Sequence, residues 1–111
     1  MSNEYTPDIW VVLKIDDSKG NLTYKVFAGW YGGYLHGDTW QLSSGILTIN
    51  EDEDHYYLLQ HSGSLYICHK DKEHMSFYMK NILTHWSTGL LIQGTTVDVV
   101  PIDSLPKPFK E

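Results

Sequence analysis

Regular alternation of apolar residues near the N-terminus is the feature that most limits how this chain can fold. The residues that alternate in the first segment are Ile9, Val11, Leu13 and Ile15. Side chains two positions apart share one face of a strand, so this period predicts a strand with a buried face. Trp10 and Val12 stand between them and indicate that the opposite face is also partly covered. After the turn formers of residues 16–21, residues 22–30 alternate again, which predicts an antiparallel hairpin.

Further strand-like segments follow along the chain. They are residues 41–49, a hairpin formed by residues 55–60 and 65–69, and a closing strand or short pair within residues 90–101. In the first of them Gly45 predicts a bulge or a break, because it has no side chain to pack. The hairpin has Ser62 and Gly63 at its predicted tip. In the closing segment Gly94 predicts a kink.

The apolar period becomes helical from residue 75. The residues at this spacing are Met75, Tyr78, Met79, Ile82 and Trp86. They predict one amphipathic helix over residues 75–85 with this stripe in the core, ended by residues 87–89. Strands joined by short turns favour an α+β fold, in which a small, mainly antiparallel sheet or half-open barrel of about five to six strands packs against one helix. Residues 1–103 form a single expected domain, and the proline-containing residues 104–111 an irregular tail.

Charge and cysteine content exclude several classes of protein. The formal net charge is −6, from fourteen acidic residues against eight lysines, with no arginine. Since arginine supplies the bidentate contacts to phosphate and guanine, we expect no direct binding of nucleic acid. The single Cys68 cannot form an internal disulfide, and Met1 is followed by polar residues rather than by a signal peptide. No apolar run approaches the ~20 residues that cross a bilayer, so we expect a cytoplasmic protein without a membrane segment.

Residues 28–40 have the least ordinary composition, with four glycines and four large aromatic residues in thirteen positions. Glycine permits close backbone approach, and Trp and Tyr supply apolar area with a polar tip, so the segment suits a shaped loop. One interpretation is a recognition loop with aromatic contacts and polar additions. Its candidate binding residues are Trp30, Tyr31, Tyr34, His36, Asp38 and Trp40. The alternative is a structural plug that closes one end of a barrel, and the glycine spacing matches no phosphate-binding loop.

Six histidines raise the question of a metal site. His55 and His61 flank a hairpin and could approach His69 in space. However, adjacent residues on a strand point to opposite faces, so Cys68 and His69 cannot bind one ion together. The same geometry weakens a catalytic pair of these two residues, and we expect Cys68 to be a small buried side chain. The sequence therefore predicts no metal, no cofactor and no catalytic residue.

The acidic run at residues 51–54 is the strongest concentration of charge in the chain. It lacks the alternating ligands and the central glycine of an EF-hand calcium loop. The simpler interpretation is a solvated turn that discourages edge-to-edge association of strands. A contact patch for a basic partner is the alternative.

Three motifs within residues 9–70 carry a resemblance. They are W-V-V-x-K-I at residues 10–15, G-D-[ST]-W-x-L-x-S-G-I at residues 37–46, and S-G-S-x-Y-x-C-H-K at residues 62–70. The chain resembles small uncharacterised proteins of tailed bacteriophages that share these motifs in this order. The resemblance implies a viral origin and a cytosolic setting in an infected bacterial host cell. It implies no activity and assigns no site residue.

Small phage proteins of this size are often accessory factors that bind and redirect host proteins. By this analogy we expect a non-catalytic accessory protein that binds and modulates or inhibits a host protein, such as a component of a defence system. The alternative is a small enzyme, or a protein that sequesters a small ligand such as a nucleotide, using the Gly/aromatic loop. An exposed edge strand could also pair two copies into a homodimer.

Overall fold

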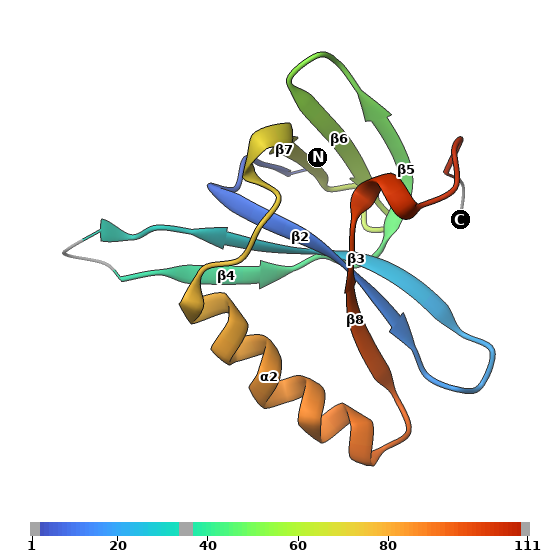
Figure 1. Cartoon of the computed structure of the whole chain (residues 1–111). Coiled ribbons are helices and arrows are strands. Elements are labelled where there is room, and N and C mark those ends of the chain that lie inside the picture. Colours follow the sequence, from blue (N-terminus) through green and yellow to red (C-terminus); the bar gives the residue numbers. More distant parts are fainter. Residues whose placement is uncertain (1–2, 34–36, 110–111) are drawn as a thin grey trace.

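Strands make up most of the regular structure. The computed structural model describes residues 3–33 and 37–109, and Figure 1 shows how their elements are arranged. The elements are β1 (Glu4–Tyr5), β2 (Ile9–Asp16), β3 (Leu22–Trp30), β4 (Thr39–Leu42), β5 (Ile46–Glu51), β6 (His55–Gln60), β7 (Leu65–His69), η1 (Lys70–Lys72), α2 (Phe77–Ile92), β8 (Thr96–Val100) and η2 (Ile102–Ser104).

The strands form two sheets, and the helix adds a third layer. One sheet has the strand order β1-β7-β6-β5 and the other has the order β4-β3-β2-β8. Neighbouring strands are antiparallel except for the short β1, which runs parallel to β7. The second sheet lies in the middle, between α2 and the first sheet. The predicted α+β class is confirmed, with more strands than expected and with no closed barrel among the described residues.

Strand β2 is buried on both faces, as the apolar residues between the alternating positions indicate. Trp10 and Val12 are fully buried and face the first sheet. Ile9, Val11 and Leu13, each no more than 5% exposed, face helix α2. A strand at the centre of three layers has no solvent-exposed face, which is why β2 has a nearly continuous apolar sequence.

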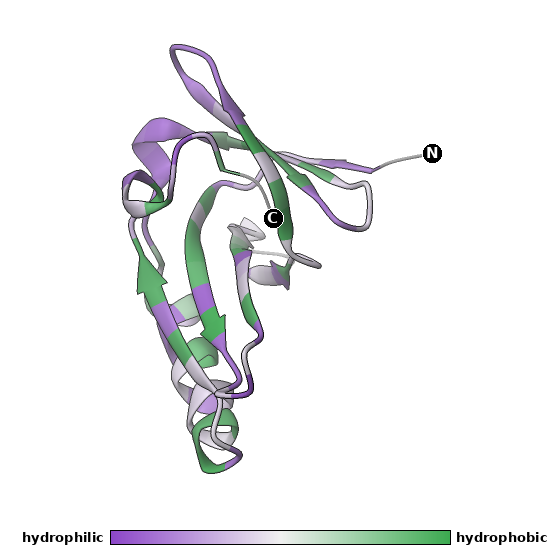
Figure 2. Cartoon of the chain, turned by 90° about the vertical axis from the view of Figure 1, so that its right-hand side faces the viewer, coloured by the Kyte–Doolittle hydropathy of each residue, from purple (hydrophilic) through white to green (hydrophobic). Residues whose placement is uncertain are grey.

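Both predicted hairpins are confirmed. Strands β2 and β3 pair from Ile9 with Gly29 to Asp16 with Leu22. Strands β6 and β7 pair from His55 with His69 to Leu59 with Leu65. Figure 2 shows that the loop at the top of the molecule, which joins β5 to β6, is hydrophilic, whereas the strands themselves carry most of the hydrophobic residues.

The break predicted at Gly45 is confirmed, but the prediction of one strand over residues 41–49 is wrong, because the chain changes sheets at this glycine. Strand β4 ends before this glycine in the second sheet, which lies in the middle, and β5 begins after it in the first sheet. Gly45 has φ 142°, and a Cβ atom there would lie 3.2 Å from the His61 ring and 3.3 Å from the Thr23 methyl group. The turn between layers therefore favours glycine for both its backbone conformation and its crowding.

Two buried polar side chains hold this change of sheet in place. The Ser43 hydroxyl accepts a hydrogen bond of 2.8 Å from the backbone N–H of Val26. The amide oxygen of Gln60, which is fully buried, accepts one of 3.3 Å from the N–H of Gly45. Buried backbone donors need such partners where no strand neighbour is available.

Helix α2 is longer than predicted and does not end at residues 87–89. It begins at the N-cap Ser76, whose hydroxyl accepts a hydrogen bond from the N–H of Met79, and it continues through Gly89. It ends where Gly94, at φ 87°, donates to the carbonyl of Leu91, and Thr95 donates to the carbonyl of Leu90. This pair of bonds is a Schellman motif, so Gly94 ends a helix and is not a kink in a strand.

The predicted helix stripe is in the core. Met79 is buried, and the other stripe residues are partly buried and pack against the apolar face of β2 and β3. Residues 105–109 form no helix or strand, as expected for the tail. Even so, Leu105 and Phe109 are 5% and 7% exposed and belong to the core between the sheets.

Two glycine-to-alanine substitutions distinguish close packing from a helix interior. In Gly29→Ala the new Cβ overlaps the buried Met79 sulfur, so we expect a loss of about 1–3 kcal/mol in the free energy of unfolding, as for overpacked cores. In Gly89→Ala the new Cβ meets no neighbour inside α2, so we expect a gain of about 0.5–1 kcal/mol. Urea denaturation of both variants measures the difference, and a destabilised Gly89→Ala would contradict the continuous helix.

Candidate functional site

The Gly/aromatic segment begins and ends on two paired strands, with Trp30 opposite Thr39. A Cβ atom on Gly32 would overlap the backbone of Gly37, so the loop closes too tightly for a side chain at that position. The Asp8 carboxylate accepts a hydrogen bond of 2.8 Å from the N–H of Tyr31 and fixes the loop to the start of β2. The candidate residues Tyr34 and His36 lie outside the described residues.

Trp30 is directed inward. Its ring is partly buried and packs against the core between the two sheets. The indole N–H donates a hydrogen bond of 3.1 Å to the carbonyl of Thr6. The ring also meets Tyr5 edge to face, with centroids 6.3 Å apart. This part of the segment therefore matches the structural interpretation of the loop.

Tyr31 and Trp40 are directed outward. Tyr31 is 55% exposed and Trp40 is 40% exposed. Trp40 stands against Phe27, at a centroid distance of 5.6 Å, on the face of the middle sheet that α2 covers. Trp30 is on the opposite face, so the two tryptophans do not form one surface. Asp38, which is exposed, lies beside Tyr31 and Thr39.

The start of α2 adds a third exposed aromatic residue, Phe77, which is 79% exposed. Its neighbours Ser76 and Tyr78 line a closed crevice together with residues of the loop. The loop residues in that crevice are Trp30, Tyr31, Asp38 and Thr39, and the space between them has no room for a water molecule. We call the surface formed by Tyr31, Asp38, Trp40 and Phe77 the aromatic corner.

Sequence reasoning missed Phe77, although a signal was present. The helical stripe places residue 77 outside the core face, where a polar residue is usual. A large aromatic residue at such a position indicates a contact surface where it belongs to a larger exposed apolar patch. What the period could not indicate is that Tyr31, Asp38 and Thr39 would lie beside the start of the helix.

Three of the side chains that the sequence offers as nucleophiles have structural roles. Cys68 is fully buried, and this burial raises the pKa of its thiol, as expected for a core residue. The hydroxyls of Ser44 and Ser62 accept hydrogen bonds from the backbone N–H groups of Ser62 and Ser64. Such bonds fix turns.

Among the histidines in the described part of the chain, two lie together as a pair. His55 and His69 are cross-strand neighbours with ring centroids 4.5 Å apart, whereas His61 lies beyond the other end of β6. Within residues 3–33 and 37–109 no group of three potential metal ligands is present.

The acidic run forms an ordered turn around Asp52. One carboxylate oxygen of Asp52 accepts hydrogen bonds from the N–H groups of Asp54 and His55, at 2.9 and 2.7 Å. The other accepts a bond of 2.6 Å from the Tyr57 hydroxyl. These bonds, that from Tyr57 foremost, lower the pKa of Asp52 to about 2.

Comparison with known proteins adds no relative. A scan against protein-family models, a search of curated proteins and a search of solved structures each found no match to this chain. In the described ranges no helix has both the length and the apolar character that crossing a membrane requires. What this protein does is therefore inferred from its own surface.

The Asp52 turn generates a prediction about pH. Because the folded-state pKa of Asp52 lies below the ordinary value of 3.8, its stabilising effect is complete above that value and is lost as the pH falls through about 2. In Tyr57→Phe the pKa of Asp52 should rise toward 3.8, and the acid-dependent loss of stability should shrink. A carboxyl-carbon NMR titration measures the shift, with Tyr31→Phe as the control. An unchanged titration in Tyr57→Phe would contradict this account.

Proposed function

We propose that this chain is a small non-catalytic accessory protein that binds another protein through the aromatic corner. The observation that carries the proposal is the exposure of three aromatic side chains, Tyr31, Trp40 and Phe77, on segments that meet where Tyr31 and Thr39 line a crevice with Ser76 and Tyr78. Aromatic residues near one another on a surface are the commonest energetic centres of protein interfaces.

The corner is held in place before any partner binds. Tyr31 follows β3 and is fixed through its N–H to Asp8. Trp40 is in β4 and rests on Phe27, and Phe77 begins a helix whose N-cap is formed by Ser76. A surface that is already ordered loses little conformational entropy on binding, which favours affinity.

Charge indicates the kind of partner. Asp38 is exposed within the aromatic corner, and the whole chain has a net charge of −6. A partner surface with apolar pockets and a basic rim would complement both features, and the opposite charges would speed association. The resemblance to tailed-phage proteins supplies the setting, in which the partner is a host protein that is modulated or inhibited.

Alanine substitutions in the aromatic corner test the proposal. In a pull-down from bacterial host lysate, we expect the wild-type protein to retain one host protein in stoichiometric amount. Trp40→Ala and Phe77→Ala should each weaken this complex by about 10-fold or more, as for hot-spot residues. The matched controls Leu22→Ala and Ile92→Ala also shorten exposed apolar side chains, at the far ends of β3 and α2, and should bind as the wild type does.

Circular dichroism and thermal unfolding establish that each variant remains folded. Equal retention by the corner variants and the controls would overturn the proposed surface. Calorimetry with cyclic nucleotides distinguishes the small-ligand alternative, because nucleotide binding without any protein complex would favour sequestration of a ligand instead.

A further inference from the structure

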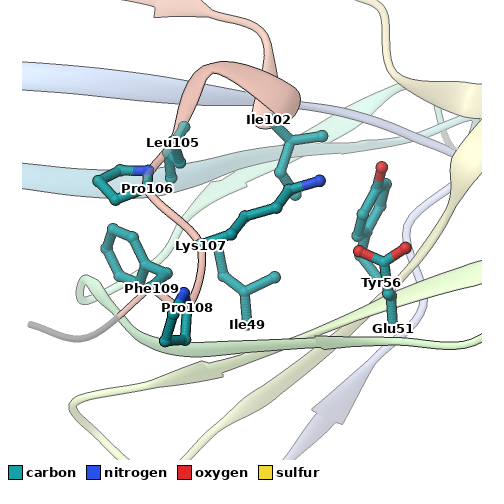
Figure 3. Close-up of a pocket in the computed structure, with 9 residues that line it drawn as sticks. All are labelled: Ile49, Glu51, Tyr56, Ile102, Leu105, Pro106, Lys107, Pro108 and Phe109. Atoms are coloured by element: carbon teal, nitrogen blue, oxygen red, sulfur yellow. The ribbon is translucent and has the colours of Figure 1, made fainter.

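A pocket of about 170 Å³ lies where residues 105–109 pack between the two sheets (Figure 3). Its walls come from β5, β6, η2 and the segment that follows η2. The lining residues are Ile49, Glu51, Tyr56, Ile102, Leu105, Pro106, Lys107, Pro108 and Phe109. The aromatic corner contributes none of these residues, so the pocket is a separate feature of the surface.

Most of the pocket wall is apolar. Ile49, Leu105 and Phe109 face it from opposite sides, and Phe109 is held by an edge-to-face contact with Tyr24 at 5.6 Å. A cavity of about 150 Å³ with such a lining accommodates a benzene ring in another protein. The space here therefore suits an apolar group of about six carbon atoms.

One end of the pocket is polar: Glu51 and Lys107 line it, and Asp103, Glu73 and Lys70 lie around Tyr56. The Tyr56 hydroxyl donates a hydrogen bond of 3.2 Å to Asp103. Burial, together with the charges of Asp103, Glu51 and Glu73, raises the pKa of Tyr56 to about 12. Three carboxylates thus act on the same hydroxyl. A negative potential of this kind favours a cation.

The two lysines near this end, Lys70 and Lys107, offset its negative potential to different extents. Lys70 is committed to Glu51 at 2.8 Å, with its ammonium 4.9 Å from the centre of the Tyr56 ring. Lys107 has a side chain that is 66% exposed, and it approaches Asp103 only to 3.8 Å. In Figure 3 the Lys107 chain extends along the pocket toward Tyr56. The Lys107 side chain, an alkyl chain that ends in an ammonium group, therefore already lies at the polar end and is held there only loosely.

We propose that this pocket binds a small primary ammonium compound with an apolar body of about six carbon atoms, in place of the Lys107 side chain. The apolar body lies against Ile49, Leu105 and Phe109. The ammonium group takes the position beside Asp103 that Lys107 now approaches. A carboxylate of the same size would meet Glu51 and Asp103 at that end and is disfavoured.

Three probes of matched shape and different charge test the proposal. Benzylammonium, benzyl alcohol and benzoate each carry one ring and one short polar group. Titrations followed by protein NMR at neutral pH should give the tightest binding for benzylammonium, with shifts at Tyr56 and Phe109. Added salt should weaken benzylammonium and leave benzyl alcohol unchanged, because only the first depends on charge.

Two variants locate the binding group. Asp103→Asn should weaken benzylammonium about threefold to tenfold, the range for a partly exposed charged contact. Lys107→Met shortens the side chain by one atom and removes the competing ammonium, and it should tighten binding by a similar factor. The matched control Lys80→Met removes the same charge from the exposed face of α2 and should have no effect.

Each of the other outcomes overturns the proposal. Absence of binding by all three probes would show that the pocket takes no ligand of this size. Equal binding of benzylammonium and benzyl alcohol would show an apolar site without selectivity for cations, and tighter binding of benzoate would show that Lys107 governs the site. An unchanged affinity in both Asp103→Asn and Lys107→Met would place the probe elsewhere.

Discussion

The fold depends on the burial of β2 on both of its faces. One set of its side chains, including Trp10, packs against the first sheet, and the other, including Leu13, packs beneath α2. The Trp10 indole also donates a hydrogen bond of 2.8 Å to the carbonyl of His69, so β2 of the middle sheet is bonded directly to β7 of the first sheet. A strand in this position requires a cover on each side, and the remaining elements supply the two covers.

This layered arrangement also determines where surface features can form. Side chains at the middle of the layers are used in packing, so contact groups gather where the layers end. The aromatic corner lies at one such margin, where β4 and the start of α2 meet. The pocket lies at another, where residues after η2 fill the space between the sheets. Both features join segments that are distant in the sequence.

The sequence predicts the parts of this fold that depend on near neighbours. Both hairpins follow from alternation and turn residues, and the helix stripe follows from its period. The structural role of a glycine is harder to predict from the sequence, because it depends on the residues that pack against it. The change of sheet at Gly45 becomes evident only when its neighbours His61 and Gln60 are known. Phe77 is visibly out of place in the helical pattern, but the packing of its neighbours Ser76 and Tyr78 beside Tyr31 depends on residues far apart in the sequence. Likewise, nothing local connects Tyr56 with Asp103.

The pairing of β2 with β8 has a consequence for how the chain reaches this structure. Val12 pairs with Val100, so this contact closes most of the length of the chain, whereas the β2–β3 and β6–β7 hairpins close short loops. Loop closure costs more entropy as the separation grows, so the hairpins form early, and β8 and the covering helix join late. Until they do, Ile9, Val11 and Leu13 are exposed to solvent. The interval before the last strand docks is therefore when this protein is most open to association with the wrong partner, including other copies of itself.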